Sequence, residues 1–402
     1  MQGFRLTTVA LAICAMHLTA AADDAPTALS DSISVSAAGS AAAADSTAAK
    51  KGFVSRIIDY FGNANKPKDD PRKFDISFIG GPYYSDEVKL ALGLVASGSY
   101  RLGEEIDTLV PPSVVALKAK VSVTGFVEAG VEGTNIFPGN RWRLMYDFRF
   151  RHLPTYYWGI GFDMCHDDAS KSKYTEVSFI ADVKMLAHLG HNFYLGPTLF
   201  FEMSNSHHVR HPELWGTQPT DVNSFGPGIE ASLDTRDNLT APERGVLVNL
   251  RQSFLPRFLG NGNYGFSFTE LTASAYQRAW TGAVIAEQVH GRWAYGNVPW
   301  TQMSSLGGSS RMRGYYEGQY RDKFEADATV EIRQHVWHRS GAVVWGGLAT
   351  IAHDPSAVRF KELLPCVGFG YRWEFKKHSN VRVDIGFGRG THGFVFSINE
   401  AF

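Results

Sequence analysis

Arg313 is the residue whose charge and position first suggest a function. It lies in the run Met312-Arg313-Gly314-Tyr315, inside a long segment between two alternating stretches of chain. A buried guanidinium is costly unless a carboxylate meets it. We expect Glu331, on the next alternating stretch, to be that partner, and the further candidates are Glu325 and Asp327. The alternative is a solvated loop cation without a fixed partner.

Two other polar groups could also do chemistry, and simpler roles are favoured for both. The first is a set of histidines, His207, His208 and His211. They could bind a metal, but they lie in a polar loop without acidic partners at fixed spacing, so we expect solvated side chains. The second is the set Asp234, Arg236 and Asp237. At the end of a strand these residues more simply pair with one another and cap a turn than perform acid–base catalysis.

No pattern in the chain predicts an enzyme, a cofactor or a bound metal. The sequence shows no Gly-rich phosphate loop, no nucleophile elbow and no paired-carboxylate cleft. With 39 basic and 40 acidic residues there is no basic surface for nucleic acid. A hydrolase with its site on the rim of a barrel is a distant alternative, because no Ser/His or Asp/His spacing supports it.

Alternation with a period of two residues positions the charged side chains. From 324 to 333 the even positions are apolar, and most odd positions carry a charge. The same pattern recurs in 142–151, 366–374 and other stretches after residue 73. Such a period places two sets of side chains on opposite faces of a strand. In a soluble sandwich the charged face meets water, whereas in a membrane barrel it lines the lumen and the apolar face meets lipid.

The N-terminus favours the membrane barrel. Residues 1–22 have a basic start, an apolar stretch and a small-residue cleavage region, which predicts a cleavable signal peptide. A lipid anchor on Cys14 is a minor alternative. Residues 23–72 form an Ala/Ser-rich tether and a short amphipathic helix, and the barrel is expected over 73–402. After residue 72 there is no disulfide framework: Cys165 and Cys366 are expected to be two unpaired thiols, or less simply one disulfide.

The fold class predicted is therefore all-β, a transmembrane antiparallel barrel of about sixteen strands. Short connections such as 189–192 and 280–282 alternate with long ones such as 204–224 and 297–320. Short periplasmic turns and long external loops are typical of outer-membrane barrels. Counted from the first strand, Arg313 falls in loop six, after the eleventh strand, and this loop is expected to fold inward.

The last stretch, 393–402, is expected to close the barrel. Its even positions are mostly large and apolar, and it ends on an aromatic residue: Phe394, Phe396, Ile398 and Phe402. Glu400 is placed with this outward set, near the membrane interface. A strand from Gly393 to Phe402 would pair with a first strand over 74–81 and remove the open edges. We call the line where these two strands meet the seam.

Glycines are expected to weaken the seam. Gly gives up side-chain packing and adds backbone freedom. The glycines placed at the end of the first strand and around the last turn are Gly80, Gly81, Gly388, Gly390 and Gly393. Positions near Ile76 and Ile398 are expected to face each other across the seam, where a disulfide would lock it.

Three features in order resemble one family. The segment 226–238, followed by Pro242 and Gly245, is similar to the strand–turn signature of the bacterial surface antigen barrels, which include the BamA/TamA-type insertases. The run Met312-Arg313-Gly314-Tyr315 is similar to that family's loop-six motif, Val/Ile-Arg-Gly-Phe/Tyr. The C-terminal strand is placed as in the family. The resemblance covers about residues 73–402, and the whole resembles the short Bacteroidetes-type members that lack polypeptide-transport-associated domains.

The resemblance implies a role in inserting or translocating proteins, or lipids, at the bacterial outer membrane. It implies contact with outer-membrane lipid, client outer-membrane proteins and a separate periplasmic partner, and no nucleic acid. It also implies that Arg313 pairs with acidic residues on strands twelve and thirteen. Glu331 matches the first, but residues 342–348 offer no carboxylate for the second. The alternative function is a passive pore or a structural subunit of a surface complex.

Overall fold

The computed structural model describes residues 75–103, 110, 112–167, 169, 171–376 and 379–402. The expected signal peptide, tether and amphipathic helix lie outside the described residues. The described chain is almost entirely β-structure, and no helix in it is long and apolar enough to cross a membrane.

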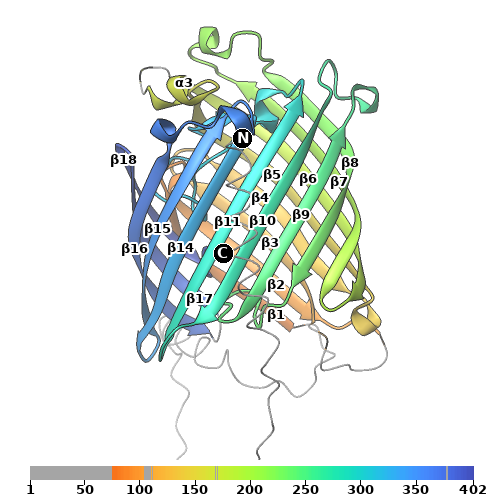
Figure 1. Ribbon diagram of the computed structural model, residues 1–402, viewed down its shortest axis with the longest axis vertical. Helices are drawn as coiled ribbons and strands as arrows, with labels where there is room; N and C mark the ends of the chain where they lie inside the picture. Colours follow the sequence, from red (N-terminus) through yellow and green to blue (C-terminus); the bar gives the residue numbers. More distant parts are fainter. Residues whose placement is uncertain (1–74, 104–109, 111, 168, 170, 377–378) are drawn as a thin grey trace, which may run out of the picture.

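The described residues form a closed antiparallel barrel (Figure 1), which confirms the predicted fold class. Its sixteen strands are β1 (Asp75–Ser85), β2 (Lys89–Tyr100), β3 (Ser113–Ser122), β4 (Val127–Ile136), β5 (Trp142–Tyr157), β6 (Ser172–Gly190), β7 (Phe193–His207), β8 (Asp221–Asp234), β9 (Gly245–Leu255), β10 (Phe266–Arg278), β11 (Ala283–Gly296), β14 (Phe324–Trp337), β15 (Ser340–Ala352), β16 (Leu364–Lys376), β17 (Ser379–Gly388) and β18 (Thr391–Ile398). Each strand pairs with the next along the chain, and β1 also pairs with β18.

The alternation along the strands decides between barrel and sandwich. On β16 the apolar residues Val367, Phe369 and Tyr371 are about half exposed, whereas Cys366 and Arg372 are buried. A sandwich would bury the apolar set, so this inverted pattern is that of a barrel with lipid outside and a charged lumen.

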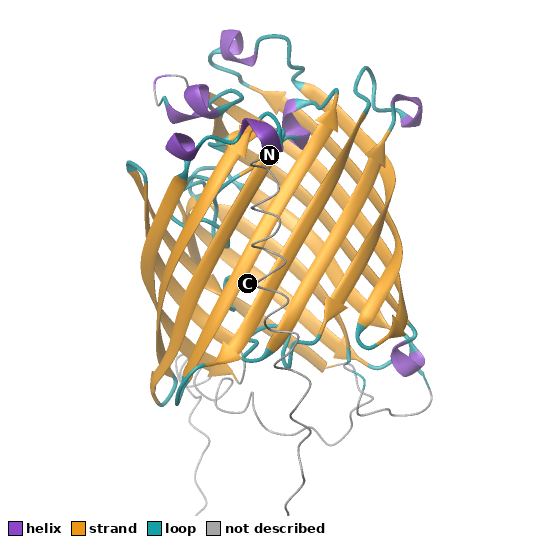
Figure 2. Ribbon diagram, in the orientation of Figure 1, coloured by secondary structure: helices purple, strands orange, loops and turns teal. Residues whose placement is uncertain are grey.

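The connections differ in length at the two ends of the barrel, and the ends are named accordingly (Figure 2). The long-loop end carries the loops after β5, β7, β9, β11 and β15, together with the short turns after β1, β3 and β17. These loops contain α3 (Phe162–His166) and single 3-10 turns: η3 (Pro212–Trp215), η4 (Arg257–Leu259), η5 (Trp300–Gln302), η6 (Pro355–Ala357) and η7 (Phe360–Glu362). The short-turn end carries the remaining connections, including η1 (Pro138–Asn140).

The last strand is shorter than the sequence indicated. β18 ends at Ile398, and Asn399 adopts a left-handed conformation with φ 66°. The chain therefore leaves the sheet and turns inward. The Arg333 guanidinium donates to the Phe402 carbonyl oxygen at 2.9 Å, and the Glu400 side chain is only 5% exposed. The expectation that Glu400 faces outward was wrong, because it assumed that the strand continues to Phe402.

The seam has far less pairing than its neighbours. β1 pairs with β2 along its whole length, from Asp75 to Ser85, and β17 pairs with β18 from Val381 to Gly388. Among the described residues, β1 and β18 share one paired position, Tyr84 with Phe396. The rings of Tyr84 and Phe394 add an edge-on contact at 5.3 Å.

Two details of the expected seam were wrong. Gly80 and Gly81 do not end the first strand but lie in its middle, opposite Leu94 and Gly93 of β2. The strand continues to Ser85, because residues 82–85 remain paired with β2. Continued from Tyr84 and Phe396, the register places Ile398 opposite Pro82, so Ile76 does not face it.

Candidate functional site: loop six and the barrel seam

Loop six, residues 297–323, carries β12 (Ser304–Ser305) and β13 (Arg321–Asp322) and folds into the lumen. Its Arg313 is 1% exposed. One guanidinium nitrogen, Nη2, donates to Glu331 on β14, and the other, Nη1, donates to Asp384 on β17 at 2.6 Å. Arg313 thus joins two strands that are not neighbours in the barrel, and its planar fork suits two carboxylates at once.

On the thirteenth strand, where the family resemblance implied a second carboxylate for Arg313, the structure has an aromatic ring. Residues 342–348 lie on β15, the thirteenth strand of the barrel. The ring centroid of Trp345, from this stretch, lies 3.7 Å from the guanidinium carbon of Arg313. A cation over an indole face is attracted by the ring quadrupole. The second carboxylate comes instead from the fifteenth strand, as Asp384.

An apolar patch on the lumen wall seats the rest of loop six. Met312 and Tyr315 pack with Val343, Trp345 and other buried residues of β15 and β16. The Tyr315 hydroxyl donates to the Pro365 carbonyl at 2.7 Å and accepts from the Arg389 backbone N–H at 2.8 Å. Burial raises the pKa of this hydroxyl, so it remains a neutral donor and acceptor.

Glycines on β17 and β18 make room for the loop-six backbone. A Cβ atom on Gly386 would lie 2.2 Å from the Arg313 carbonyl oxygen, and one on Gly388 would lie 2.6 Å from the Tyr315 ring. A Cβ atom on Gly393 would lie 3.1 Å from the Gly314 Cα. Gly314 itself has φ 116°, a conformation that other residues rarely adopt. We call Gly386, Gly388 and Gly393 the glycine strip.

Arg313 is one member of a buried ionic chain that runs toward the short-turn end. Glu331 also accepts from Arg333 at 2.9 Å, and Asp384 also accepts from Arg372 at 2.5 Å. Arg372 in turn donates to Glu400 at 2.8 Å. Buried charges are costly alone, so this alternation of opposite charges offsets the desolvation of each member.

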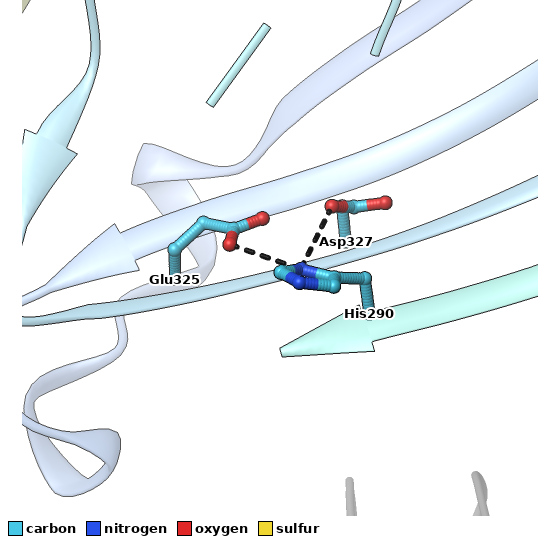
Figure 3. Close-up of side chains that lie close together, drawn as sticks. All are labelled: His290, Glu325 and Asp327. Atoms are coloured by element: carbon cyan, nitrogen blue, oxygen red, sulfur yellow. Dashed lines mark ion pairs between the residues drawn. The ribbon is translucent and has the colours of Figure 1, made fainter. Parts of the chain in front are cut away.

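Glu325 and Asp327 do not contact Arg313, which corrects their place as candidate partners. Both bind Arg311 instead, and they lie beside His290 of β11 (Figure 3). The reason is their position along β14. Inward-facing side chains on this strand are two residues apart, and each such step moves the side chain roughly 7 Å along the lumen wall. Glu331 lies level with Arg313, and the other two lie level with Arg311.

The remaining candidates lie outside loop six. Arg236 donates to both carboxylate oxygens of Asp234, at 2.9 and 3.0 Å, in the β8–β9 turn at the short-turn end. Asp237 accepts from the Glu243 backbone in the same turn, which Gly245 completes with φ 100°. His211 is exposed and contacts Glu213, in the loop after β7. Cys165 and Cys366 are free, buried thiols.

Four residues at the site were not predicted from the sequence: Asp384, Trp345, Arg311 and His290. Asp384 occupies an inward position of an alternating stretch, so its direction could be read from the pattern, but its closeness to Arg313 depends on barrel curvature. Arg311 lies two residues before Arg313, on a loop whose path the pattern does not specify.

Comparisons with known proteins agree with this geometry. The model of the Omp85 superfamily domain matches residues 126–347, more than half of the chain. Similar solved structures include BamA from Haemophilus ducreyi lacking POTRA domains 1–3, at a TM-score of 0.53 and 12% identity, covering 81% of this chain and 70% of that one. CdiB from Escherichia coli is similar at a TM-score of 0.52 and 11% identity, covering 86% and 70%.

A third structure, CdiB from Acinetobacter baumannii, is similar at a TM-score of 0.50 and 8% identity, covering 86% of this chain and 67% of that one. At such identities the structures show a shared fold. No curated protein matches the sequence. The match of the family model over most of the strands that carry and surround loop six leads to one conclusion: this chain belongs to the Omp85 superfamily.

Proposed function

We propose that this protein inserts or translocates other proteins at the bacterial outer membrane, by opening its barrel laterally at the seam. Membership of the Omp85 superfamily supports this class of function. In this mechanism a client strand adds to the exposed edge of β1 or β18 by β-augmentation.

The single paired position between β1 and β18 carries the proposal. Each backbone hydrogen bond that is not replaced makes a barrel more costly to open in lipid. Opening between β17 and β18 would break pairing from Val381 to Gly388, whereas opening the seam breaks pairing only around Tyr84 and Phe396. Separating β1 from β18 therefore breaks less backbone pairing than separating β17 from β18.

Loop six contacts both sides of the seam at the long-loop end. On one side it packs against the glycine strip of β17 and β18. On the other side the Glu317 backbone N–H donates to Glu87, in the turn between β1 and β2, at 2.8 Å. The loop is thus placed to hold the two edges together until a client engages one of them.

The passive-pore alternative is less well supported. Loop six, the ionic chain and the inward-turned segment after Asn399 place side chains across the lumen. An open channel would leave this space to water.

The partners that fit the proposal are outer-membrane lipid around the exposed apolar belt, client barrel proteins at the seam and a separate periplasmic protein that delivers them. The proposed location is the bacterial outer membrane.

A disulfide across the seam tests the proposal. Tyr84→Cys with Phe396→Cys places the thiols at the observed paired position. Paired strand positions have Cα separations compatible with a disulfide. In cells that depend on this protein, the oxidised variant should fold but fail to support growth and normal levels of outer-membrane proteins, and reduction should restore both.

A matched control keeps one of the two cysteines. Phe396→Cys with Val383→Cys links β18 to β17 and leaves the seam free. This variant should retain activity. If the seam-locked barrel works as well as the control, lateral opening is not the mechanism and the passive-pore alternative takes its place.

A further inference from the structure

We propose that His290, Glu325 and Asp327 form a binding site for a divalent transition-metal ion such as Zn²⁺, and that Arg311 competes with the metal for it. The three side chains converge from neighbouring strands of the lumen wall (Figure 3). His290 of β11 lies directly opposite Asp327 of β14 in the strand register, and Glu325 is two residues away on the same face.

The donor set suits a transition metal. One imidazole nitrogen and one oxygen from each carboxylate lie within 4.8 Å of one another, and all three residues are buried. Zn²⁺ binds imidazole nitrogen and carboxylate oxygen at about 2.0–2.2 Å. Zinc sites with three protein ligands leave a fourth position for water, and histidine and carboxylate side chains are both among the ligands of this class of ion.

One atom of Arg311 lies among the three side chains, where a metal ion would lie. Its Nη1 atom lies 2.6 Å from Asp327 Oδ2 and 3.1 and 3.4 Å from the two oxygens of Glu325. The same atom also contacts Nδ1 of His290. A guanidinium Nη carries two hydrogens. Four acceptors around one such nitrogen therefore exceed what it can satisfy, whereas one metal ion could bind them all.

A carboxylate behind the histidine is the second feature of a metal site. Nε2 of His290 lies 3.2 Å from Oε1 of Glu270 on β10. The Glu270 carboxylate accepts from Nε2. Arg311 has only donors and faces Nδ1, so that contact needs the neutral tautomer, in which the lone pair of Nδ1 points into the cluster. Metal-binding histidines usually donate their other N–H to a carboxylate or carbonyl in this manner.

Arg311 also controls access to the site. Its side chain is 25% exposed, whereas those of Glu325 and Asp327 are 1% and 0% exposed. Asp327 Oδ1 is buried and has no hydrogen-bond partner among the described residues. Rotation of Arg311 toward the lumen would open the cluster and free both oxygens of Asp327 for coordination. Arg313 would keep loop six in place meanwhile, so the metal site does not require the seam to open.

Metal titration of the purified full-length protein in detergent tests the proposal. Co²⁺ is followed by its visible absorption, and Zn²⁺ is used to displace it. All proteins carry His207→Gln, His208→Gln and His211→Gln, so that this group of exposed histidines cannot contribute. In this background we compare the otherwise unchanged barrel with Arg311→Ala, His290→Gln and Glu270→Gln, and with His353→Gln as a surface control. A shift on gels after heating verifies that each barrel is folded.

We expect one Co²⁺ per barrel in the background protein, displaced by Zn²⁺. Arg311→Ala should tighten binding at least tenfold, because the competing cation is gone. His290→Gln should abolish it, Glu270→Gln should weaken it about tenfold, and His353→Gln should leave it unchanged. Absence of binding in the folded background protein, or unchanged binding in His290→Gln, overturns the site. Equal affinity with and without Arg311 overturns the competition.

Discussion

At the residue scale, one guanidinium holds two distant strands. Arg313 meets Glu331 of β14 and Asp384 of β17, with the Trp345 ring against its face. The two carboxylates are fully buried, so each depends on its cations. Removing one partner of a buried pair costs more than the pair contributes, because a charge remains without compensation.

Arg313→Ala should therefore destabilise the barrel by about 3–5 kcal/mol, as for other broken buried pairs. The measurement is the temperature at which the folded band disappears on gels. Arg359→Ala is the matched control: this arginine pairs with Glu362 in an exposed loop, where pairs contribute little. Equal transition temperatures for the two variants would show that Arg313 does not stabilise the barrel.

A pH effect at Glu87 belongs to the same scale. Burial, and then the nearby Glu317 charge, raises the pKa of Glu87 above its ordinary value of 4.5. A group whose pKa is raised by folding stabilises the fold when protonated and loses that contribution as the pH rises through the raised pKa. The Glu317 backbone donates to Oε1, an acceptor that glutamine retains.

Glu87→Gln should accordingly make the variant more stable than the wild type above the raised pKa, with the difference disappearing below pH 4.5. Unfolding midpoints across that range measure it. Asp354→Asn should show the opposite sign. The Ser356 hydroxyl and backbone lower the pKa of Asp354, so its ionised form stabilises the fold, and the asparagine variant should be less stable than the wild type at neutral pH. A constant difference at every pH would mean that Glu87 acts through packing and not through charge.

At the element scale, loop six and the glycine strip fit each other. Gly388 and Gly393 were expected to loosen the seam, but in the structure these two glycines, together with Gly386, allow the close approach of loop six. Side chains at these positions would meet the loop backbone or the Tyr315 ring.

Gly386→Ala should displace loop six and lower stability by about 1–3 kcal/mol, the usual cost of overpacking. Gly81→Ala is the control within the seam strand, because a Cβ atom there has nothing within 4 Å. Protease cleavage in loop six is the readout: it should increase in Gly386→Ala and stay at the wild-type rate in Gly81→Ala. The same rate in both would contradict the fit of loop and strip.

At the scale of the whole molecule, closure satisfies the backbone in lipid. Every barrel strand in the described chain has a partner on both sides, although the seam has little pairing. Without water in the bilayer core, an open edge would leave backbone groups unsatisfied.

The protein should therefore fractionate with the outer membrane and migrate faster on gels when it is not boiled, since a closed barrel resists the detergent. Membrane fractionation and paired boiled and unboiled samples measure this. Recovery in the soluble periplasm, with no change on boiling, would exclude the transmembrane barrel.

The strands and the faces of their side chains can be predicted from the sequence. A period of two is local, so Glu331 and Asp384 could be assigned to the lumen from their own neighbours, and the long loop with Arg313 followed from spacing. Which inward-facing residues contact one another depends on the folded barrel. Arg313 reaches both Glu331 and Asp384 because the curved wall turns the inner faces of β14 and β17 toward the same part of the lumen. Glu400 turns inward because the strand ends before Asn399. Both depend on contacts between residues far apart in the chain, which a local period does not encode.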